Sequence, residues 1–158
     1  GYVALLQRLD VESRFPVVGF FERVMGAEQW RTYIARMKEE GCHADFVAED
    51  RGQLVGFLST TCSDFAAVRQ LRIVIGILQA YTGQGIGTRL FVAAEAWARC
   101  AGIQRLELLV EANNARAIAL YVKMGFEFEG VIERAVRIDG DWVDDLVMAK
   151  WLESEHDA

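Results

Sequence analysis

The chain has 158 residues, of which 53% are hydrophobic and 25% are charged, and its formal net charge at pH 7 is −6. This length is typical of one domain with a substantial core, and the apolar content argues against disorder. Because the apolar runs are too short to cross a bilayer and the net negative charge repels polyanions, we expect no membrane and no nucleic acid as partner.

The first third of the chain predicts a strand, two helices and a hairpin. The apolar run Val3–Leu9 is typical of a strand, and Val11–Met25 predicts an irregular helix. Apolar residues recur at helical spacing in Ala27–Glu40, which predicts a regular helix. Two β-type runs flank an Asp-Arg-Gly turn within Ala44–Ser59, which predicts a β-hairpin.

The middle of the chain predicts a strand, a glycine-rich turn, a helix and a second strand. After a connector at Asp64–Ala67, the β-branched run Val68–Leu78 predicts a buried central strand. Gly76 inside it marks a bulge, a close approach of a ligand to the backbone, or a packing accommodation. The glycine turn precedes the helical pattern of Ile86–Ala101, and the run L-E-L-L-V then predicts a second buried strand, so the two strands should be parallel.

The last third predicts a helix and a long antiparallel hairpin. Asn113 or Asn114 can cap a helix over Ala115–Met124. The two runs on either side of Asp139-Gly140 predict the hairpin, and the acidic end Glu153–Ala158 is expected to fray.

The turn T-G-Q-G-I-G after the central strand predicts a pyrophosphate site, because glycines let a phosphate approach the unpaired N–H groups of the next helix. It also resembles the start of a dinucleotide fingerprint, in which Glu111 would bind a ribose. Against that alternative, the spacing is G-x-G-x-G and only one strand–helix–strand unit is present. A P-loop is excluded because no Lys-Ser/Thr pair follows the turn.

The cysteines and histidines indicate no metal or nucleophile site. Cys42, Cys62 and Cys100 lack zinc-ligand spacing and fit reduced thiols, and His43 and His156 have no metal or nucleophile partner in the sequence. With no signal-peptide pattern, we expect a single domain over residues 1–158 in the cytoplasm.

The glycine turn and the later segment N-A-R-A-I-A-L-Y-V-K-M-G-F, residues 114–126, together resemble the GNAT superfamily of acyl-CoA-dependent N-acetyltransferases. Its signature is Q/R-x-x-G-x-G/A followed by N-x-x-A-I-x-L-Y-x-x-x-G-F. The last hairpin is similar to that of a subgroup acting on free amino acids or similar small amines. The resemblance implies an α/β (α+β) domain with a mixed, mostly antiparallel twisted sheet of about six or seven strands, a splayed central parallel pair and about four flanking helices.

The same resemblance implies acetyl-CoA as co-substrate, a primary amine of a small molecule as acceptor, and transfer by direct attack in a ternary complex. Tyr121 would stand near the thioester sulfur and protonate the leaving thiolate, since a phenol is protonated at neutral pH. The strand backbone and Asn114 would bind the pantetheine arm, and the glycine turn would bind the pyrophosphate. The implied cofactor-binding residues are Ile75, Ile77, Thr82, Gly83, Gln84, Gly85, Ile86, Gly87, Thr88, Asn114 and Tyr121.

Two positions depart from the family pattern. Thr82 replaces the usual Gln or Arg, so we expect weaker coenzyme binding. Leu71 and Leu109 stand where many relatives carry a catalytic carboxylate, which leaves Glu111 as the candidate base and a water relay as its alternative. An acyl-CoA-binding module without catalysis, or an enzyme acting on protein N-termini or polyamines, therefore stays open as an alternative function.

Several side chains are candidates for secondary roles. The nearest basic residues for the terminal phosphate are Arg89, Arg116 and Lys123. Four aromatic residues from the first helices and the last hairpin are candidate walls of an acceptor pocket: Phe20, Phe21, Trp30 and Trp142. The edges of a mixed sheet also make a homodimer a reasonable expectation.

Overall fold

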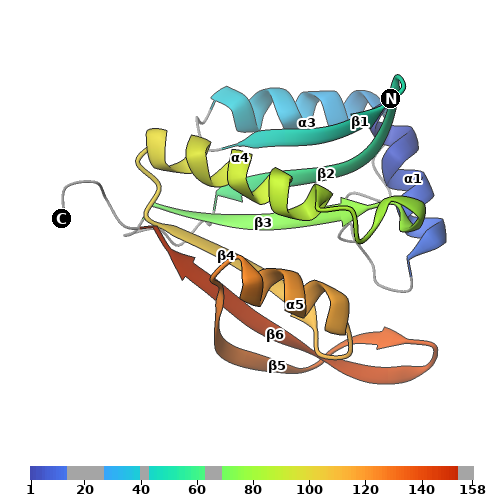
Figure 1. The fold of residues 1–158 in the computed structure, drawn as a ribbon, viewed down its shortest axis with the longest axis vertical. Helices are drawn as coiled ribbons and strands as arrows, with labels where there is room; N and C mark the ends of the chain where they lie inside the picture. The colour runs from blue at the N-terminus through green and yellow to red at the C-terminus, as the bar shows by residue number, and fades with distance from the viewer. Residues whose placement is uncertain (14–26, 40–42, 63–68, 153–158) are drawn as a thin grey trace.

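The structure is a computed structural model that describes residues 1–13, 27–39, 43–62 and 69–152. Its centre is a six-stranded sheet in the order β1-β2-β3-β4-β6-β5 (Figure 1). The strands are β1 (Ala44–Asp50), β2 (Gln53–Cys62), β3 (Gln70–Ile77), β4 (Arg105–Glu111), β5 (Glu127–Ile138) and β6 (Asp141–Trp151). The described helices are α1 (Tyr2–Glu12), α3 (Ala27–Glu39), α4 (Ile86–Cys100) and α5 (Ala115–Lys123), with a short 3-10 turn η1 (Gln79–Tyr81).

The sheet confirms the predicted fold class. All neighbouring strands are antiparallel except the central pair β3 and β4, which are parallel and joined through α4. The two predicted hairpins are β1–β2 and β5–β6, and the second turns at Asp139 and Gly140 with φ angles of 53° and 91°. The register of β2 and β3 is continuous across Gly76, so this glycine does not mark a bulge.

The N-terminal segment corrects one expectation: Val3–Leu9, predicted as a strand, lies within helix α1. Leu5 and Leu9, four residues apart, are each only 2% exposed and pack into the core from one side of the helix. Arg8 and Glu12 form an ion pair at the i, i+4 spacing of a helix. A short apolar run fits both periodicities, and here the helical spacing of the two leucines decides.

Three predicted segments lie wholly or mostly outside the described residues, namely Val11–Met25, Asp64–Ala67 and Glu153–Ala158.

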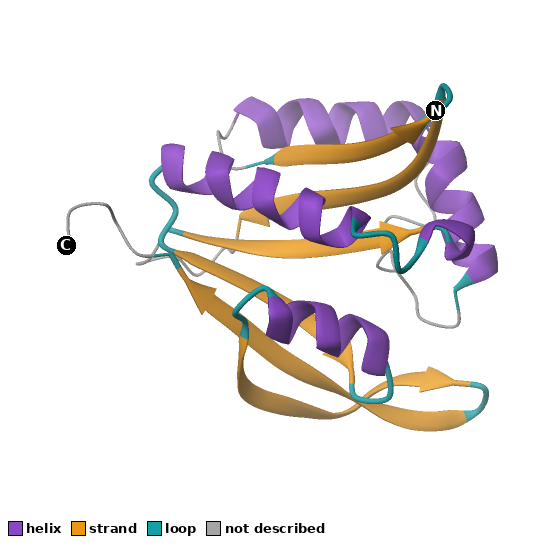
Figure 2. Cartoon of the chain, viewed as in Figure 1, coloured by secondary structure: helices purple, strands orange, loops and turns teal. Residues whose placement is uncertain are grey.

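The helices cover the two faces of the sheet differently (Figure 2). Helices α4 and α5 lie on one face, where Lys150 of β6 bonds to Glu95 of α4 and to the Met124 carbonyl after α5, both at 2.7 Å. Helix α1 packs on the opposite face through Tyr2, whose ring meets Phe57 edge-on at 5.5 Å between centroids. These two faces are called the α4/α5 face and the α1 face below.

The central strands pair only at their first residues. Gln70–Arg72 of β3 pairs with Arg105–Glu107 of β4, and beyond these residues the two strands diverge (Figure 1). The remaining residues of β3 still pair with β2, and those of β4 still pair with β6. The sheet is therefore continuous at one end of the central pair and split at the other.

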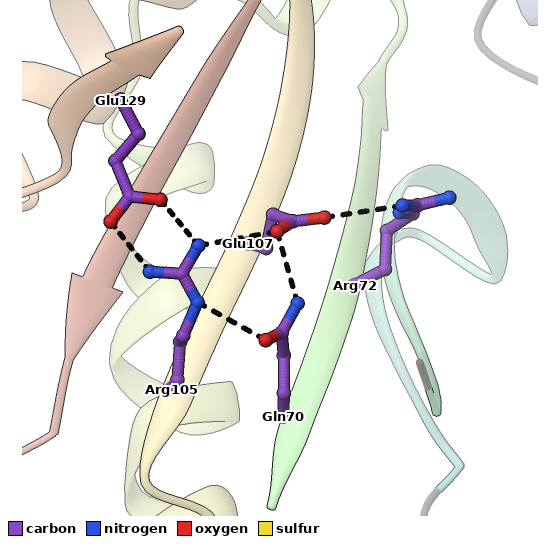
Figure 3. A network of polar contacts seen from close by, with 5 residues as sticks. All are labelled: Gln70, Arg72, Arg105, Glu107 and Glu129. Carbon is purple, nitrogen blue, oxygen red and sulfur yellow. Dashed lines mark hydrogen bonds and ion pairs between the residues drawn. The ribbon is translucent and has the colours of Figure 1, made fainter. Parts of the chain in front are cut away.

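A polar network on the α1 face ties together the paired end (Figure 3). The buried Arg105 guanidinium donates to both carboxylate oxygens of Glu129, to Gln70 Oε1 at 3.1 Å and to Glu107 Oε2 at 3.2 Å. Arg72 donates to the other Glu107 oxygen at 3.1 Å. Because the network joins β3, β4 and β5, it holds the point from which the strands splay.

Candidate active site

A cavity of about 990 Å³ lies where β3 and β4 diverge. Its walls come from the end of α1, from β3 and the turn after it, from the start of α4, and from β4, α5 and the last hairpin. The cavity gathers both candidate catalytic residues and all but one of the expected cofactor-binding residues: Ile75, Ile77, Thr82, Gly83, Gly85, Ile86, Gly87, Thr88, Glu111, Asn114 and Tyr121. Gln84 is the exception, and its side chain instead donates to the Ala80 carbonyl at 3.1 Å.

The β3 edge of the cavity carries backbone groups without a strand partner. The Leu78 N–H donates to the Val55 carbonyl of β2 at 2.9 Å. Since successive residues of a strand direct their backbone groups to opposite sides, Ile73, Ile75 and Ile77 direct theirs away from β2 and toward the gap. Beyond Arg72, β4 is too far away to pair with them. An extended ligand with amide groups could therefore bind there as a partial strand.

The cavity also passes through the sheet. Ile75 and Ile77 have their side chains on the α4/α5 face, where a Cβ built on Gly87 of α4 would lie 3.4 Å from Ile77 Cδ1. Leu109 and Glu111 alternate along β4 with the buried Leu108 and Val110 and therefore have their side chains on the α1 face. A molecule that threads the gap can thus contact groups on both faces.

The glycine turn ends in an uncapped helix N-terminus. Gly83 and Gly85 have φ angles of 75° and 76°, a left-handed conformation that favours glycine. Gly85 is the N-cap of α4 and supplies no side-chain cap, and the first turn of the helix contains no acidic residue. The first turn of α4 thus offers backbone N–H donors and the positive end of the helix dipole to an anion.

Gly87 has a structural role that the sequence did not reveal. A Cβ at this position would lie 2.7 Å from Leu120 Cδ2, so the missing side chain lets α4 and α5 approach each other beside the turn.

Two basic side chains from α5 reach the same turn. Arg116 Nη1 donates to Thr82 Oγ1 at 2.9 Å, and Thr82 Oγ1 donates in turn to the Gln79 carbonyl at 2.8 Å. Lys123 Nζ lies 3.5 Å from Thr88 Oγ1. Both cations line the cavity, whereas Arg89 does not. Thr82 therefore holds a guanidinium at the turn, close to where the family's long Gln or Arg side chain would start.

Tyr121 packs in an aromatic cluster and faces the cavity. Its side chain is 7% exposed, and its ring lies edge-on to Phe91 with 5.9 Å between centroids. Its hydroxyl has no hydrogen-bond partner among the residues that the structure describes. Burial, with a smaller effect of the Glu111 charge, raises the pKa of Tyr121 well above its ordinary value, so the phenol keeps its proton at neutral pH.

Glu111 and Asn114 lie together at the end of β4. The Asn114 side chain accepts from the Ala117 N–H at 3.2 Å and caps α5, which identifies the cap among the two candidates. Burial raises the pKa of Glu111, and the neighbouring Asp145 raises it further, although a hydrogen bond from Asn114 acts in the opposite direction. A carboxylate with a raised pKa is a stronger base than a solvated one.

Asp145 is a cavity residue that sequence reasoning missed. It belongs to β6, lines the cavity, and stands opposite Glu111 in the β4–β6 register. Its Oδ1 atom is buried without a hydrogen-bond partner in the described structure. Only the register of the last hairpin against β4 could have found it, because 34 positions of sequence separate the pair (145 minus 111).

The structure does not place the aromatic candidates for an acceptor wall in the cavity. Trp142 does not line the cavity; it is 56% exposed and stacks on the Arg137 guanidinium 5.2 Å away. Val136 is the residue of the last hairpin that reaches the cavity beside Asp145. Phe20 and Phe21 lie outside the described residues, and the Trp30 side chain is not described.

His43 contacts the hairpin formed by β1 and β2. The buried ring lies against the Thr60 carbonyl and the Asp45 carboxylate, with Nε2 2.9 Å from Asp45 Oδ2. It does not line the cavity.

None of the described helices is long and apolar enough to span a bilayer.

Comparison with known proteins places this geometry in a family. A model described as the Acetyltransferase (GNAT) family matches residues 6–126. The chain is 30% identical over 118 residues to N-alpha-acetyltransferase RimI of Mycobacterium tuberculosis, covering 73% of each protein. An acetyltransferase of the GNAT family from Streptococcus pneumoniae has a similar structure, with a TM-score of 0.87, 27% identity and coverage of 96% of this chain and 92% of that one.

A second group of relatives is longer. The chain is 36% identical over 87 residues to mycothiol acetyltransferase of Amycolatopsis mediterranei, which covers 51% of this chain but only 29% of that protein. It likewise spans 30% of the mycothiol acetyltransferase of Jonesia denitrificans.

Proposed function

Because the chain belongs to the GNAT family of acetyltransferases, we propose that it transfers the acetyl group of acetyl-CoA to the primary amine of a small molecule. The observation that carries this proposal is the cavity between the splayed strands. It combines an unpaired strand edge that suits the pantetheine amides with a glycine turn that suits the pyrophosphate, and Tyr121 lines the same cavity. We propose that residues 1–158 act as one such domain.

The cations beside the glycine turn fit the negative charge of the coenzyme. Arg116 and Lys123 flank the N-terminus of α4, and neither forms an ion pair with a described residue. In a chain with a net charge of −6, these local cations and the N–H groups of the turn supply the attraction that the whole molecule does not. Arg116 also compensates in part for Thr82, so coenzyme binding should be weaker than in relatives but not abolished.

Glu111 and Tyr121 supply the proton transfers. The acceptor amine arrives as an ammonium ion, and Glu111, directly or through water, takes one of its protons so that the nitrogen lone pair can attack the thioester carbonyl. As the tetrahedral intermediate collapses, the C–S bond breaks and Tyr121 donates its proton to the departing sulfur. The attacking nitrogen still carries two protons and a positive charge, and it passes one proton to the Tyr121 oxygen as the neutral amide forms, so the protons balance.

The names of relatives do not agree on one acceptor. RimI is named for N-alpha acetylation, mycothiol acetyltransferase for mycothiol, and a relative from Pseudomonas aeruginosa, 32% identical over 62 residues, for L-methionine sulfoximine and L-methionine sulfone. Structures of other GNAT proteins reported with acetyl-CoA share the fold with TM-scores of 0.80 and 0.76. These comparisons favour acetyl-CoA as the donor and leave the acceptor to experiment.

The test of this function is a panel of primary amines assayed for release of the coenzyme A thiol. We expect release above background with at least one small amine, and calorimetry should show acetyl-CoA binding but no NAD binding. Binding of acetyl-CoA with no thiol release for any acceptor would favour the non-catalytic module. NAD binding without acetyl-CoA binding would contradict the proposal.

We also propose a homodimer formed through the β5 side of the sheet. This strand is one of the two edges of the described sheet, has 12 residues, and exposes Phe128, Val131 and Ile132. A long exposed apolar edge favours pairing with another chain. Sedimentation that shows only monomer at assay concentrations would contradict this proposal.

A further inference from the structure

Glu111 and Asp145 form a pair of carboxylates on the α1 side of the cavity. They are register partners on the antiparallel strands β4 and β6. The Ala112 N–H donates to the Asp144 carbonyl at 2.8 Å, so the next pair, 111 with 145, is of the non-hydrogen-bonded type, whose Cα atoms lie about 4.5 Å apart. Side chains of such a pair leave the sheet on the same face and are close neighbours.

No cation of the described structure neutralises this pair. Neither carboxylate forms an ion pair with a described lysine, arginine or histidine. Asp145 Oδ1 is buried without a partner, and burial raises the pKa of Asp145 above its ordinary value. Like charges directly opposite each other on a sheet are unfavourable, as is a buried oxygen without a partner. The arrangement thus lacks a positively charged group that a ligand can provide.

Charge is separated across the cavity. The cations Arg116 and Lys123 belong to α5, beside the glycine turn. On the α1 side, Arg72 is the cation that lines the cavity, and it is already bonded to Glu107 at 3.1 Å. Glu12 of α1, the other charged wall residue described there, accepts from the Gln79 N–H at 3.1 Å and forms an ion pair with Arg8. Among the described wall residues on the α1 side, Glu111 and Asp145 are therefore the charged groups without a countercharge.

We propose that Glu111 and Asp145 together bind the acceptor as an ammonium ion, and that the acceptors are primary amines without a carboxylate next to the amine. This inference rests on the proposed acetyltransferase function. Glu111 is the proton acceptor, and Asp145 fixes the ammonium group beside it. The nearby Leu109 and Val136 offer apolar contacts to the rest of the acceptor.

The chemical class of the proposed acceptors follows from electrostatics. An alkylammonium ion brings one positive charge to two negative ones, whereas a free α-amino acid also brings its own carboxylate within a few ångströms of the same pair. Among the described residues that line that side of the cavity, no cation is free of an ion pair to receive it. Like-charge contacts of this kind are a common means of rejecting a wrong ligand. The proposal therefore favours a decarboxylated amine over the free amino acid that the last hairpin led us to expect.

The experiment compares 3-methylbutylamine with leucine, which differ only by the carboxylate. Acetylation kinetics are measured for wild type, for Asp145→Asn, and for the control Asp144→Asn. Asp144 is adjacent on β6 but does not line the cavity, and its Oδ1 accepts from the Arg134 N–H. The control removes the same charge. Because the Asp144 charge contributes to the raised pKa of Asp145, its loss keeps Asp145 ionised, so the preference for the amine should not fall.

For wild type we expect kcat/KM to favour 3-methylbutylamine over leucine by about tenfold or more. Asp145→Asn should reduce this preference by about tenfold, mainly through a higher KM for the amine. The ratio of kcat/KM for the two acceptors is compared between wild type and Asp145→Asn, so differences in the intrinsic reactivity of the acceptors cancel. A ratio that stays the same in Asp145→Asn would overturn the proposal. A wild-type preference for leucine would overturn it as well.

A binding measurement separates this inference from the proposed function. The melting temperature of each protein is measured with and without 3-methylbutylamine, in the absence of acetyl-CoA. The amine should raise the melting temperature of wild type and of Asp144→Asn, and raise that of Asp145→Asn less. If no acetyl transfer is found but this pattern holds, the amine site stands and the proposed function fails. If transfer occurs but the amine stabilises wild type and Asp145→Asn equally, the inference about Asp145 fails.

Discussion

Replacing Tyr121 by Phe removes one oxygen atom from the centre of the proposed site. The ring should stay in place, because it is held by edge-on packing against Phe91 and by a tilted contact with Phe126 at 6.2 Å. The hydroxyl makes no hydrogen bond to the described residues, so its loss leaves no protein partner unpaired. The free energy of unfolding should therefore change by less than about 1 kcal/mol.

Turnover should respond very differently. Without the phenol, the departing thiolate has no proton donor at this position, and loss of general acid catalysis typically reduces kcat by about 10²-fold or more. The assay is steady-state release of the coenzyme A thiol at saturating acetyl-CoA and amine, with calorimetry for acetyl-CoA affinity and urea denaturation for stability. The control is Tyr2→Phe, which removes a hydroxyl that contacts Asp45. Neither residue lines the cavity, so this variant should keep wild-type turnover. Wild-type turnover in Tyr121→Phe would refute the assignment.

Three further changes test the structure around the site. Lys150→Met removes the 2.7 Å partner of the Glu95 carboxylate, which is 8% exposed and keeps its ion pair with Arg99 at 3.4 Å, so the change should cost about 2 kcal/mol in urea denaturation; a loss below about 0.5 kcal/mol would contradict the role of the Lys150–Glu95 pair. Gly85→Ala and the hairpin control Gly52→Ala each put alanine at a positive φ and should each cost about 1 kcal/mol, but only the former should weaken acetyl-CoA binding in calorimetry. Glu111→Gln tests the raised pKa of Glu111. The wild-type carboxyl favours the folded state at low pH and loses this advantage as pH rises through its raised pKa, so the melting temperature of the variant relative to wild type should be higher at pH 8 than at pH 4. A difference in melting temperature that does not depend on pH would count against the raised pKa.

Much of the fold followed from local patterns. The β-branched runs, the glycine turn and the Asn114 cap each depend on residues close together in sequence, and the structure has the corresponding strands, turn and helix. The family assignment, which rested on two motifs with fixed spacing, is confirmed by the family model. The error at α1 arose because a seven-residue apolar run, Val3–Leu9, satisfies strand and helix patterns alike, and only its packing against the sheet distinguishes them.

The candidate site was predictable only on one side. Tyr121, Asn114 and the glycine turn belong to motifs and could be named from the sequence. Asp145 belongs to no motif, and its position opposite Glu111 depends on which strand inserts between β4 and β5. The role of Arg116 was likewise hidden, because its contact with Thr82 joins a helix and a turn that are 34 positions apart (116 minus 82). Long-range pairing therefore determines the acceptor side of the cavity, and local sequence determines much of the coenzyme side.

The most direct test of the central claim is mass spectrometry of a reaction that contains purified protein, acetyl-CoA and 3-methylbutylamine. The proposed function predicts N-acetylated amine in amounts equal to the coenzyme A released, and predicts that Tyr121→Phe forms it about 10²-fold more slowly. If a folded protein that binds acetyl-CoA formed no acetylated product from this amine or from any other primary amine in the panel, the claim that the cavity between β3 and β4 is an acetyltransferase site would be wrong.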